Sequence, residues 1–371
     1  MVIRLLQKNK RSFFHLKISS SMTRLLLALL VMIASPGFAQ RRIDTIINAE
    51  FTAGHFSGTV LVAKNGQILS QTHKGYSNLQ FAVPMTDTTR LPIASMTKLF
   101  TAILTLQLYE KSLLRLDDQV GKFVGGLPAD CQNITILQLL THHSGLKNES
   151  AQTYQNPYST AEFVRRFVAK KDGLPVTVFN YNNIDYILLT RVLEAVSKKT
   201  YSDLVQVNIL NPIGMARSGV ISEDQVVIGL AYGYHNYSFG ASTQSTPLKN
   251  DLPMYLSNYA GAGSIYSTTR DLFKLIQALK QNKLLTSKTT TLLTSPQLPG
   301  FVEYARGYPT FGFYCNDKTF SRPVLERRGS INGFNSALLT DQSFSQVVIL
   351  LANTDTCDLE LIGDKLYAEF K

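Results

Sequence analysis

The feature that most constrains the fold is a change of hydrophobic pattern along the chain. Residues 58–73 contain two β-rich stretches joined by Asn65-Gly66, the strongest two-residue hairpin signal. Residues 335–351 contain two strand patterns around a polar turn, and 359–370 form an amphipathic helical pattern. Between these ends, apolar residues recur at helical spacing. The sequence therefore predicts that the two terminal segments of the chain form a sheet and that the central segment is mostly helical.

This pattern predicts an α+β fold with two subdomains. We expect a sheet subdomain built from 40–93 and 255–371, and a mostly helical subdomain over 94–254. Neither an internal repeat nor a low-complexity linker interrupts the chain. We therefore treat residues 40–371 as one functional domain.

Composition excludes several classes of protein. A chain of 371 residues with 44% apolar and 17% charged residues has ample material for a core, which excludes intrinsic disorder. Six of its 37 Lys and Arg residues lie in the acid-free first 39 residues, so the remainder has 31 basic against 26 acidic residues. This small excess does not predict a nucleic-acid partner. Three cysteines are too few for a disulfide framework, and at least one must be unpaired within the chain.

Residues 1–39 have the pattern of a secretory signal peptide. A basic stretch leads into ten apolar residues at 25–34, and small residues stand at the −3 and −1 positions before Gln40. Ten apolar residues cover only about half of a bilayer core, which disfavours a permanent membrane anchor. We expect an exported protein, periplasmic or extracellular, without a permanent membrane span. Translation can start at Met1 or at Met22, and the long stretch before Met22 favours the second.

Ser95-Met-Thr-Lys98 is the first candidate for catalysis. It opens a helical pattern, and residues i and i+3 share a helix face, so the Ser95 hydroxyl and the Lys98 amine can meet there. A lysine can take the serine proton only if burial or a nearby cation lowers its pKa. Ser144-Gly-Leu-Lys147 has the same spacing, but Gly145 breaks the helix and predicts a loop.

Tyr181-Asn182-Asn183 is the second candidate, placed just before another helical pattern. The tyrosine could relay a proton, and Asn183 could bind a substrate amide. The same Tyr-x-Asn spacing occurs at 154–156 and at 314–316, and an isolated match is more often a turn. Spacing alone does not choose among the three.

Taken together, these residues resemble the serine β-lactamase and penicillin-binding protein superfamily. The similarity is greatest to the branch with class C β-lactamases, D-alanyl-D-alanine carboxypeptidases and esterases, whose second motif is Tyr-x-Asn. Family-like blocks follow in family order along nearly the whole mature chain, at 56–64, 93–98, 116–118, 134–146, 179–183, 212–215, 262–267 and 329–334. The order of these blocks selects Ser95, Tyr181 and the motif near Gly329.

The resemblance implies a role for each matched residue. Ser95 would be the acylated nucleophile, Lys98 its proton acceptor and Tyr181 the proton relay. Asn183 would contact the substrate and the lysine, and the backbone N–H groups of Ser95 and Ser330 would form the oxyanion hole. The resemblance also implies an antiparallel sheet of about five strands, flanked by N- and C-terminal helices. It implies neither a cofactor nor a metal, and His142 and His143 are then packing or loop-anchoring residues.

The third motif departs from the family pattern. Lys-Thr-Gly or His-x-Gly is usual there, whereas this chain has Arg327-Arg328-Gly329. Arg327 keeps a positive charge that could bind a substrate carboxylate and hold Lys98 neutral. Either arginine could instead be a solvated cation on an edge strand. This departure weakens the expectation of β-lactam turnover more than that of Ser95 chemistry.

The sequence thus predicts an exported serine hydrolase that works through an acyl-enzyme. Expected substrates are D-amino-acid or peptidoglycan-type peptides and small esters, with weak or no turnover of β-lactams. The alternative is a non-catalytic module of the same fold that binds or senses cell-wall peptides. Loops at 148–158 and 232–258 are expected to shape the pocket.

Overall fold

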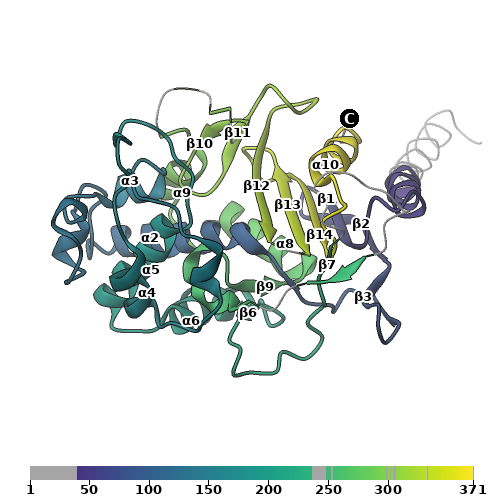
Figure 1. Ribbon diagram of the computed structural model, residues 1–371. Coiled ribbons are helices and arrows are strands. Elements are labelled where there is room, and N and C mark those ends of the chain that lie inside the picture. The colour runs from purple at the N-terminus through teal and green to yellow at the C-terminus, as the bar shows by residue number, and fades with distance from the viewer. Residues whose placement is uncertain are drawn as a thin grey trace, which may run out of the picture.

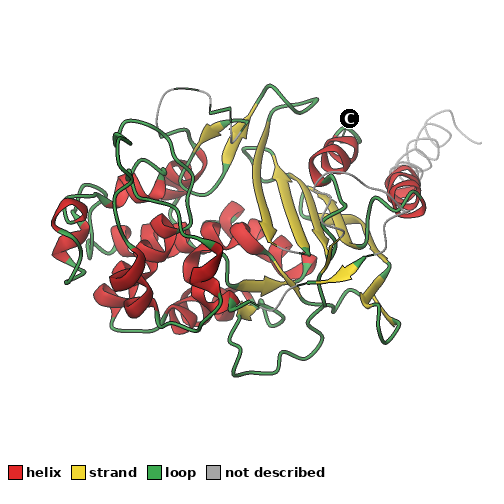
Figure 2. Ribbon diagram, viewed as in Figure 1, coloured by secondary structure: helices red, strands yellow, loops and turns green. Residues whose placement is uncertain are grey.

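The structure is a computed structural model that describes residues 40–235, 248–251, 254–297, 300, 302–303, 306–331 and 333–370. The predicted signal peptide and part of the loop at 232–258 lie outside the described residues. Most of the helices gather on one side of the molecule, and the largest sheet lies on the other with helices packed against it (Figure 2).

The two ends of the chain build the main sheet together. Strands β1 (Gly58–Lys64) and β2 (Gln67–Lys74) form the predicted hairpin, in which Asn65 and Gly66 both adopt positive φ as a tight turn requires. The C-terminal strand β14 (Gln346–Ala352) pairs antiparallel with β1 over its whole length. Residues almost 300 positions apart therefore lie side by side (Figure 1).

The sheet has the order β10-β11-β12-β13-β14-β1-β2. Its five long strands include β12 (Val324–Ile331) and β13 (Phe334–Thr340), and they correspond to the sheet that the family resemblance implies. The short strands β10 (Tyr308–Pro309) and β11 (Tyr314–Asn316) extend it to seven. The α+β expectation is confirmed, with two more strands than expected at one edge.

Helices cover both faces of this sheet. Residues 40–52 and α10 (Leu359–Tyr367) pack on one face, where they share an apolar cluster with β1 and β14. Helix α8 (Thr269–Lys280) packs against β1 and β14 on the opposite face. Because helices cover both faces of the sheet, the side chains on both sides of β14 are buried, which explains its almost continuous run of apolar residues.

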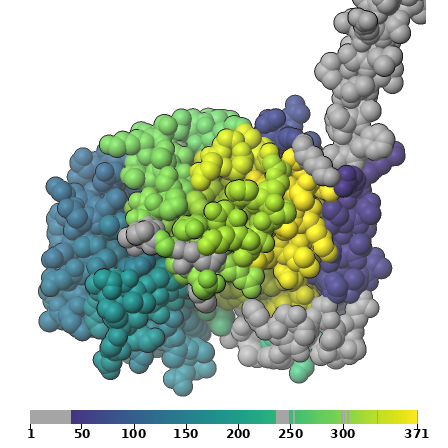
Figure 3. Space-filling model, turned by 90° about the horizontal axis from the view of Figure 1, so that it is seen from above, coloured from purple at the N-terminus to yellow at the C-terminus, as the bar shows by residue number. Residues whose placement is uncertain are grey.

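The helical region surrounds α2 (Thr97–Glu110), which is buried over most of its surface. It contacts α5 (Ile184–Ser197), as expected for apolar residues at helical spacing. The other helices are α3 (Ile136–Leu140), α4 (Thr160–Phe167), α6 (Tyr201–Val205), α7 (Asn211–Ile213) and α9 (Ser287–Thr294). In the space-filling view, the blue and teal helical segment lies opposite the purple and yellow chain ends (Figure 3).

The remaining elements are short. The 3-10 turns are η1 (Ala94–Met96), η2 (Val120–Lys122), η3 (Ala129–Cys131), η4 (Ala151–Tyr154) and η6 (Leu256–Ala262), and η5 (Gln206–Leu210) is a π-helical turn. The remaining strands pair as β3 (Tyr76–Asn78) with β4 (Val83–Pro84), β9 (Ile265–Ser267) with β5 (Leu91–Pro92) and β6 (Gly219–Val220), and β7 (Tyr234–His235) with β8 (Lys249–Asn250). Within the described part of the chain, no helix has the length and hydrophobicity needed to cross a membrane.

Candidate active site

Ser95 lies in η1, between the sheet and the first turn of α2. The preceding residue, Ala94, has φ of 48°, a left-handed conformation that is costly for a residue with a side chain. Strand β12 passes directly beside this turn. A Cβ atom on Gly329 would lie 2.8 Å from the Ser95 nitrogen and closer still to the Ile93 carbonyl oxygen. Only glycine allows this contact, which explains the glycine of the third motif.

Lys98 is completely buried beside Ser95, on the first turn of α2. Its Nζ lies 3.1 Å from Ser95 Oγ and donates to Asn183 Oδ1 at 2.7 Å. It also donates to the Ala262 carbonyl at 2.9 Å. The residue before Ala262 is also tied to α2, because Thr101 Oγ1 donates to the Gly261 carbonyl at 2.7 Å. This hydrogen bond helps to hold the Ala262 carbonyl in place. The helical region therefore surrounds the amine with oxygen atoms.

The surroundings of Lys98 weaken the hold of its amine on a proton. Burial is the main cause that lowers its pKa below the usual value, and the nearby charge of Arg327 acts in the same direction. Tyr181 and Glu149 oppose this shift. Burial or a neighbouring cation can lower the pKa of a lysine enough for it to act as a base, and both are present at Lys98.

Tyr181 reaches the same oxygen from the segment before α5. Its hydroxyl lies 2.8 Å from Ser95 Oγ, and Lys98 Nζ lies 5.0 Å from the centre of its ring. Burial alone would raise the pKa of Tyr181, but the charges of Lys98 and Arg327 lower it below its ordinary value. Asn148 holds the segment by donating to the Tyr181 carbonyl at 3.1 Å.

Asn183 connects Lys98 to two residues that sequence reasoning missed. Its Nδ2 donates to Glu149 Oε1 at 2.6 Å, and the Tyr154 hydroxyl donates to the same oxygen, also at 2.6 Å. Tyr154 stacks on Tyr259 with ring centres 3.8 Å apart. Glu149 and Tyr154 lie in the loop expected to shape the pocket, but no residue spacing marks either as a contact of Asn183.

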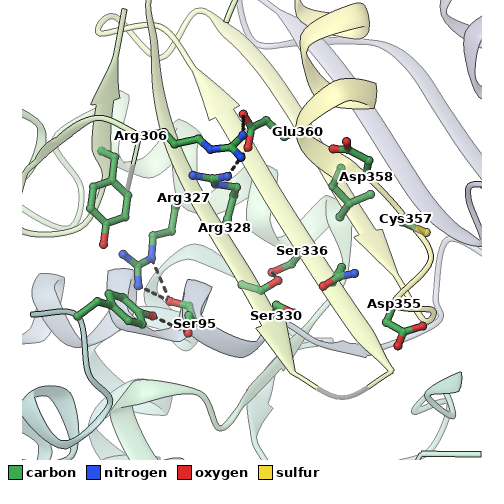
Figure 4. A pocket seen from close by; sticks show the side chains of 15 residues that line it. Ser95, Arg306, Arg327, Arg328, Ser330, Ser336, Asp355, Cys357, Asp358 and Glu360 are labelled. Carbon is green, nitrogen blue, oxygen red and sulfur yellow. Dashed lines mark hydrogen bonds and ion pairs between the residues drawn. The ribbon is translucent and has the colours of Figure 1, made fainter. Parts of the chain in front are cut away.

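The structure separates the two arginines of β12 (Figure 4). Arg327 is buried, and its Nε and Nη2 donate to the Ser95 carbonyl oxygen at 3.0 and 2.8 Å. Arg328 points away from Ser95 and forms ion pairs with Glu326 and Glu360. Alternation along the strand explains the difference, because neighbouring residues face opposite sides of a sheet. Arg327 is therefore the cation next to Ser95.

Ser95 lies between two pockets. One, of about 600 Å³, runs along β12 past Ser330 to the N-terminus of α10 (Figure 4). The other, of about 240 Å³, is bordered by Asn183, Tyr259 and again Ser330. A substrate with groups on both sides of its scissile bond can thus occupy both pockets with Ser95 between them.

His142 and His143 are held by the protein itself. His142 Nδ1 lies 2.8 Å from Asp185 Oδ2, and both side chains are buried. Burial raises the pKa of Asp185 and lowers that of His142, which favours a neutral pair behind Tyr181. His143 Nδ1 lies 2.7 Å from the Thr141 carbonyl. Among the described residues, no group of three or more His, Cys, Asp and Glu could hold a metal ion.

Comparison with known proteins identifies the class. The antiparallel sheet joined to a helical region, with a partly exposed serine next to a buried lysine where they meet, is the arrangement that the sequence resemblance implies. A model of the Beta-lactamase family matches residues 43–367, which is most of the chain, and the protein belongs to this family. It is accordingly an enzyme, a serine hydrolase of the β-lactamase-related type.

Two curated relatives and one solved structure illustrate the similarity. The chain is 29% identical to teichoic acid D-alanine hydrolase of Staphylococcus aureus, over 80% of this chain and 70% of the relative. It is 25% identical to penicillin-binding protein 4* of Bacillus subtilis, over 85% and 72% of the two chains. The D-amino acid amidase of Ochrobactrum anthropi shares the fold, with a TM-score of 0.78, 21% identity and coverage of 89% and 98%.

Proposed function

We propose that Ser95 is the nucleophile of an exported hydrolase that cleaves amide or ester bonds through an acyl-enzyme. The observation that carries this proposal is the set of atoms around Lys98 Nζ. A neutral amine has two hydrogens and one lone pair. Asn183 Oδ1 and the Ala262 carbonyl oxygen accept the two hydrogens, so the lone pair remains for the Ser95 hydroxyl, 3.1 Å away. Lys98 can then take the serine proton.

Attack joins Ser95 Oγ to the substrate carbonyl carbon and moves the hydroxyl proton to Lys98. The carbonyl oxygen becomes an oxyanion, for which we propose the backbone N–H groups of Ser95 and Ser330 as donors. The close approach of Gly329 to the Ser95 nitrogen supports this pairing, because it brings β12 alongside the serine. Ser330 borders both pockets, as an oxyanion donor between acyl and leaving groups must.

Tyr181 is the proposed relay to the leaving group. Its hydroxyl, 2.8 Å from Ser95 Oγ, can pass the proton held by Lys98 to the departing nitrogen or oxygen when the scissile bond breaks. Water then attacks the ester carbonyl carbon on Ser95. A proton of the water returns to Ser95 Oγ through Tyr181 and Lys98 as the ester bond breaks, and the acid is released. Asn183 serves this cycle by contacting Lys98, and one face of it also borders the smaller pocket.

The proposed substrates are D-aminoacyl esters or amides, including peptidoglycan-type peptides, and small esters. Support comes from the names of the relatives, a teichoic acid D-alanine hydrolase and a penicillin-binding protein. We propose weak or no turnover of β-lactams. Arg327 directs two donor groups at the Ser95 carbonyl, so part of its hydrogen-bonding capacity is used within the protein rather than on a substrate carboxylate.

Export is part of the proposal. The acid-free, apolar pattern of residues 1–39 supports cleavage before Gln40, and release outside the cytoplasm would give access to envelope polymers. N-terminal sequencing of the protein secreted by a bacterial host should begin at Gln40. An N-terminus at Met1 or Met22 on the exported protein would contradict it.

A burst experiment with p-nitrophenyl acetate tests the nucleophile. This small activated ester requires no natural substrate, so the wild-type protein should release one equivalent of nitrophenol rapidly as Ser95 is acylated. Ser95→Ala should lose the burst and reduce the acylation rate by about 10³-fold or more. Ser144→Ala is the matched control, because it removes the serine of the other Ser-x-x-Lys sequence and should keep the burst.

Intact mass measured during the burst should show one acetyl group on the wild-type chain and none on Ser95→Ala. Equal, burst-free traces for both proteins would contradict the proposal. They would favour the alternative of a binding module with the same fold.

A further inference from the structure

Glu149 is a half-buried neighbour of the catalytic residues with an unusual set of contacts. Its Oε1 accepts from both Asn183 Nδ2 and the Tyr154 hydroxyl. Its other oxygen is shielded from solvent and has no hydrogen-bond partner among the described residues. Glu149 borders neither pocket beside Ser95, although Asn183 and Tyr259 do. These contacts place Glu149 behind Asn183, on the side away from the substrate.

A carboxylate at this place determines which way the Asn183 amide points. The two ends of an asparagine amide are nearly the same in shape but opposite in hydrogen bonding, since the nitrogen donates and the oxygen accepts. An ionised carboxylate only accepts, so the nitrogen must face Glu149. The Asn183 oxygen must then face Lys98.

This orientation matters for the base. With the oxygen toward it, Asn183 accepts a hydrogen from Lys98 and leaves the lone pair of the amine free. With the amide reversed, the Asn183 nitrogen would donate a hydrogen bond to that lone pair. The lone pair could then not accept the hydroxyl proton of Ser95. We propose that Glu149 is a positioning residue: by fixing the Asn183 amide, it reserves the lone pair of Lys98 for the Ser95 proton. This proposal rests on the proposed function of Ser95 and Lys98.

The loop around Glu149 is built to hold the carboxylate in place. Tyr154, which donates to it, is buried and stacks nearly parallel on Tyr259 at the edge of the smaller pocket. The Tyr255 N–H donates to the Tyr154 carbonyl at 2.9 Å, which ties this loop to the segment that leads into η6. η6 also supplies the Ala262 carbonyl, the other acceptor of Lys98. Both acceptors of the amine therefore depend on one packed unit.

The charge of Glu149 has a separate effect that a purely structural residue would not have. It raises the pKa of Lys98, against the lowering by burial and by Arg327. Removing this charge should therefore let the pKa of Lys98 fall further, and the acidic limb of the acylation rate should move to lower pH. The charged and titratable groups around the amine are Tyr181, Tyr186, Arg327, Glu149, His142 and Asp185.

Two substitutions of Glu149 separate orientation from charge. Glu149→Met removes the acceptor at similar length, so Asn183 can reverse. Glu149→Gln keeps an oxygen that can accept from Asn183 Nδ2 and Tyr154, but has no charge. The matched control is Glu162→Met, which removes a glutamate of α4 that pairs with Arg166 on the surface.

The readout is the acylation rate across pH with two substrates. p-Nitrophenyl acetate has no ammonium group, whereas D-alanine p-nitroanilide carries one. We expect the acylation rate of Glu149→Met to fall about tenfold or more with both substrates, as part of the roughly 10²- to 10⁴-fold that a general base contributes. Glu149→Gln should keep close to the wild-type plateau with an acidic limb at lower pH, and Glu162→Met should match the wild type.

Acylation of Glu149→Met at the rate of Glu162→Met would overturn the proposal. So would a loss confined to D-alanine p-nitroanilide in both Glu149 variants, which would instead make the carboxylate a binding site for a substrate ammonium group. If Glu149→Met does not fold, judged by circular dichroism, Glu149→Ala provides the same comparison. A wild-type protein without a Ser95-dependent burst would contradict the proposed function itself, whereas a normal burst with unaffected Glu149 variants contradicts this inference alone.

Discussion

At the scale of single residues, Gly329 shows how closely the sheet approaches the nucleophile. Two of the three atoms nearest to a Cβ at this position are the backbone oxygen of Ile93 and the backbone nitrogen of Ser95, which cannot move aside as a flexible side chain can. The same turn contains Ala94 with positive φ. The position of the Ser95 nitrogen therefore depends on the absence of one methyl group on β12.

Gly329→Ala should destabilise the protein by about 1–3 kcal/mol, the usual cost of overpacking, and strongly reduce acylation of Ser95. Thermal unfolding and the p-nitrophenyl acetate burst measure the two effects. Gly125→Ala is the control, because a Cβ at Gly125 meets no atom within 4 Å and both properties should stay near wild type. A Gly329→Ala protein with wild-type activity would show that β12 does not constrain the serine turn.

At the scale of elements, the Arg327 side chain of β12 links the sheet to the turn that carries Ser95. Arg327 crosses from the strand to the Ser95 carbonyl and makes two hydrogen bonds to that single oxygen. A planar guanidinium can donate from two nitrogens at once, whereas a lysine presents a single charged nitrogen. Arg328, on the other face of the strand, connects β12 to Glu360 of α10 instead.

Arg327→Lys should therefore reduce acylation by Ser95 more than Arg328→Lys does, although both keep the charge. We expect a loss of stability of about 1.5–3 kcal/mol for Arg327→Lys, the range for hydrogen bonds to charged groups, reduced by whatever contact the lysine regains. Burst kinetics and urea unfolding of the two variants provide the measurement. A larger loss of activity in Arg328→Lys than in Arg327→Lys would show that Arg328 is the cation that supports Ser95.

At the scale of the whole molecule, pH should affect stability through Glu326. This carboxyl lies in the sheet, and its burial raises its pKa from the ordinary 4.5 to about 7, against the opposing effect of Arg328. Between those two pH values, the folded protein holds a proton that the unfolded chain has released. Ionisation therefore opposes folding, and the contribution of Glu326 to stability falls as the pH rises from 4.5 to 7.

Glu326→Gln should remove this dependence, because glutamine does not titrate. The melting temperature of the variant relative to wild type should rise steadily between pH 4.5 and 7 and then level off. A constant difference across this range would show that Glu326 has the same pKa in both states. Measuring Glu303→Gln in parallel controls for the general effect of removing one acidic residue.

The parts of the fold and site that could be predicted are those encoded by local patterns. The hairpin of β1 and β2 follows from Asn65-Gly66 and its flanking strands, and the proximity of Ser95 and Lys98 follows from one helical turn. Membership of the family was recognisable from the order of the motif blocks, and the family model confirms it. The roles of Ser95, Lys98, Tyr181, Asn183, Arg327, Gly329 and Ser330 remain predictions, as do the signal peptide and the subdomain boundaries.

Contacts between distant segments could not be predicted in this way. Glu149 and Tyr154 reach Asn183 only because the loop after α3 folds back against the start of α5, and no periodicity encodes that meeting. Tyr154 and Tyr314 belong to the two Tyr-x-Asn sequences that the motif order rejects, yet Tyr154 lies behind Asn183 and Tyr314 lines the larger pocket. The last two strands at one edge of the sheet, β10 and β11, are two and three residues long, too short to give a strand pattern.

By itself, the sequence determined the α+β class, the hairpin and the pairing of a serine with a lysine one helical turn away, because these depend on neighbouring residues and backbone periodicity. Only the tertiary structure decided that Arg327 rather than Arg328 faces the serine, that Lys98 is fully buried, and that Glu149 lies behind Asn183. The physical reason is that burial, charge and hydrogen-bond direction depend on which distant segments pack together, and these properties control the protonation of Lys98 and the geometry around Ser95.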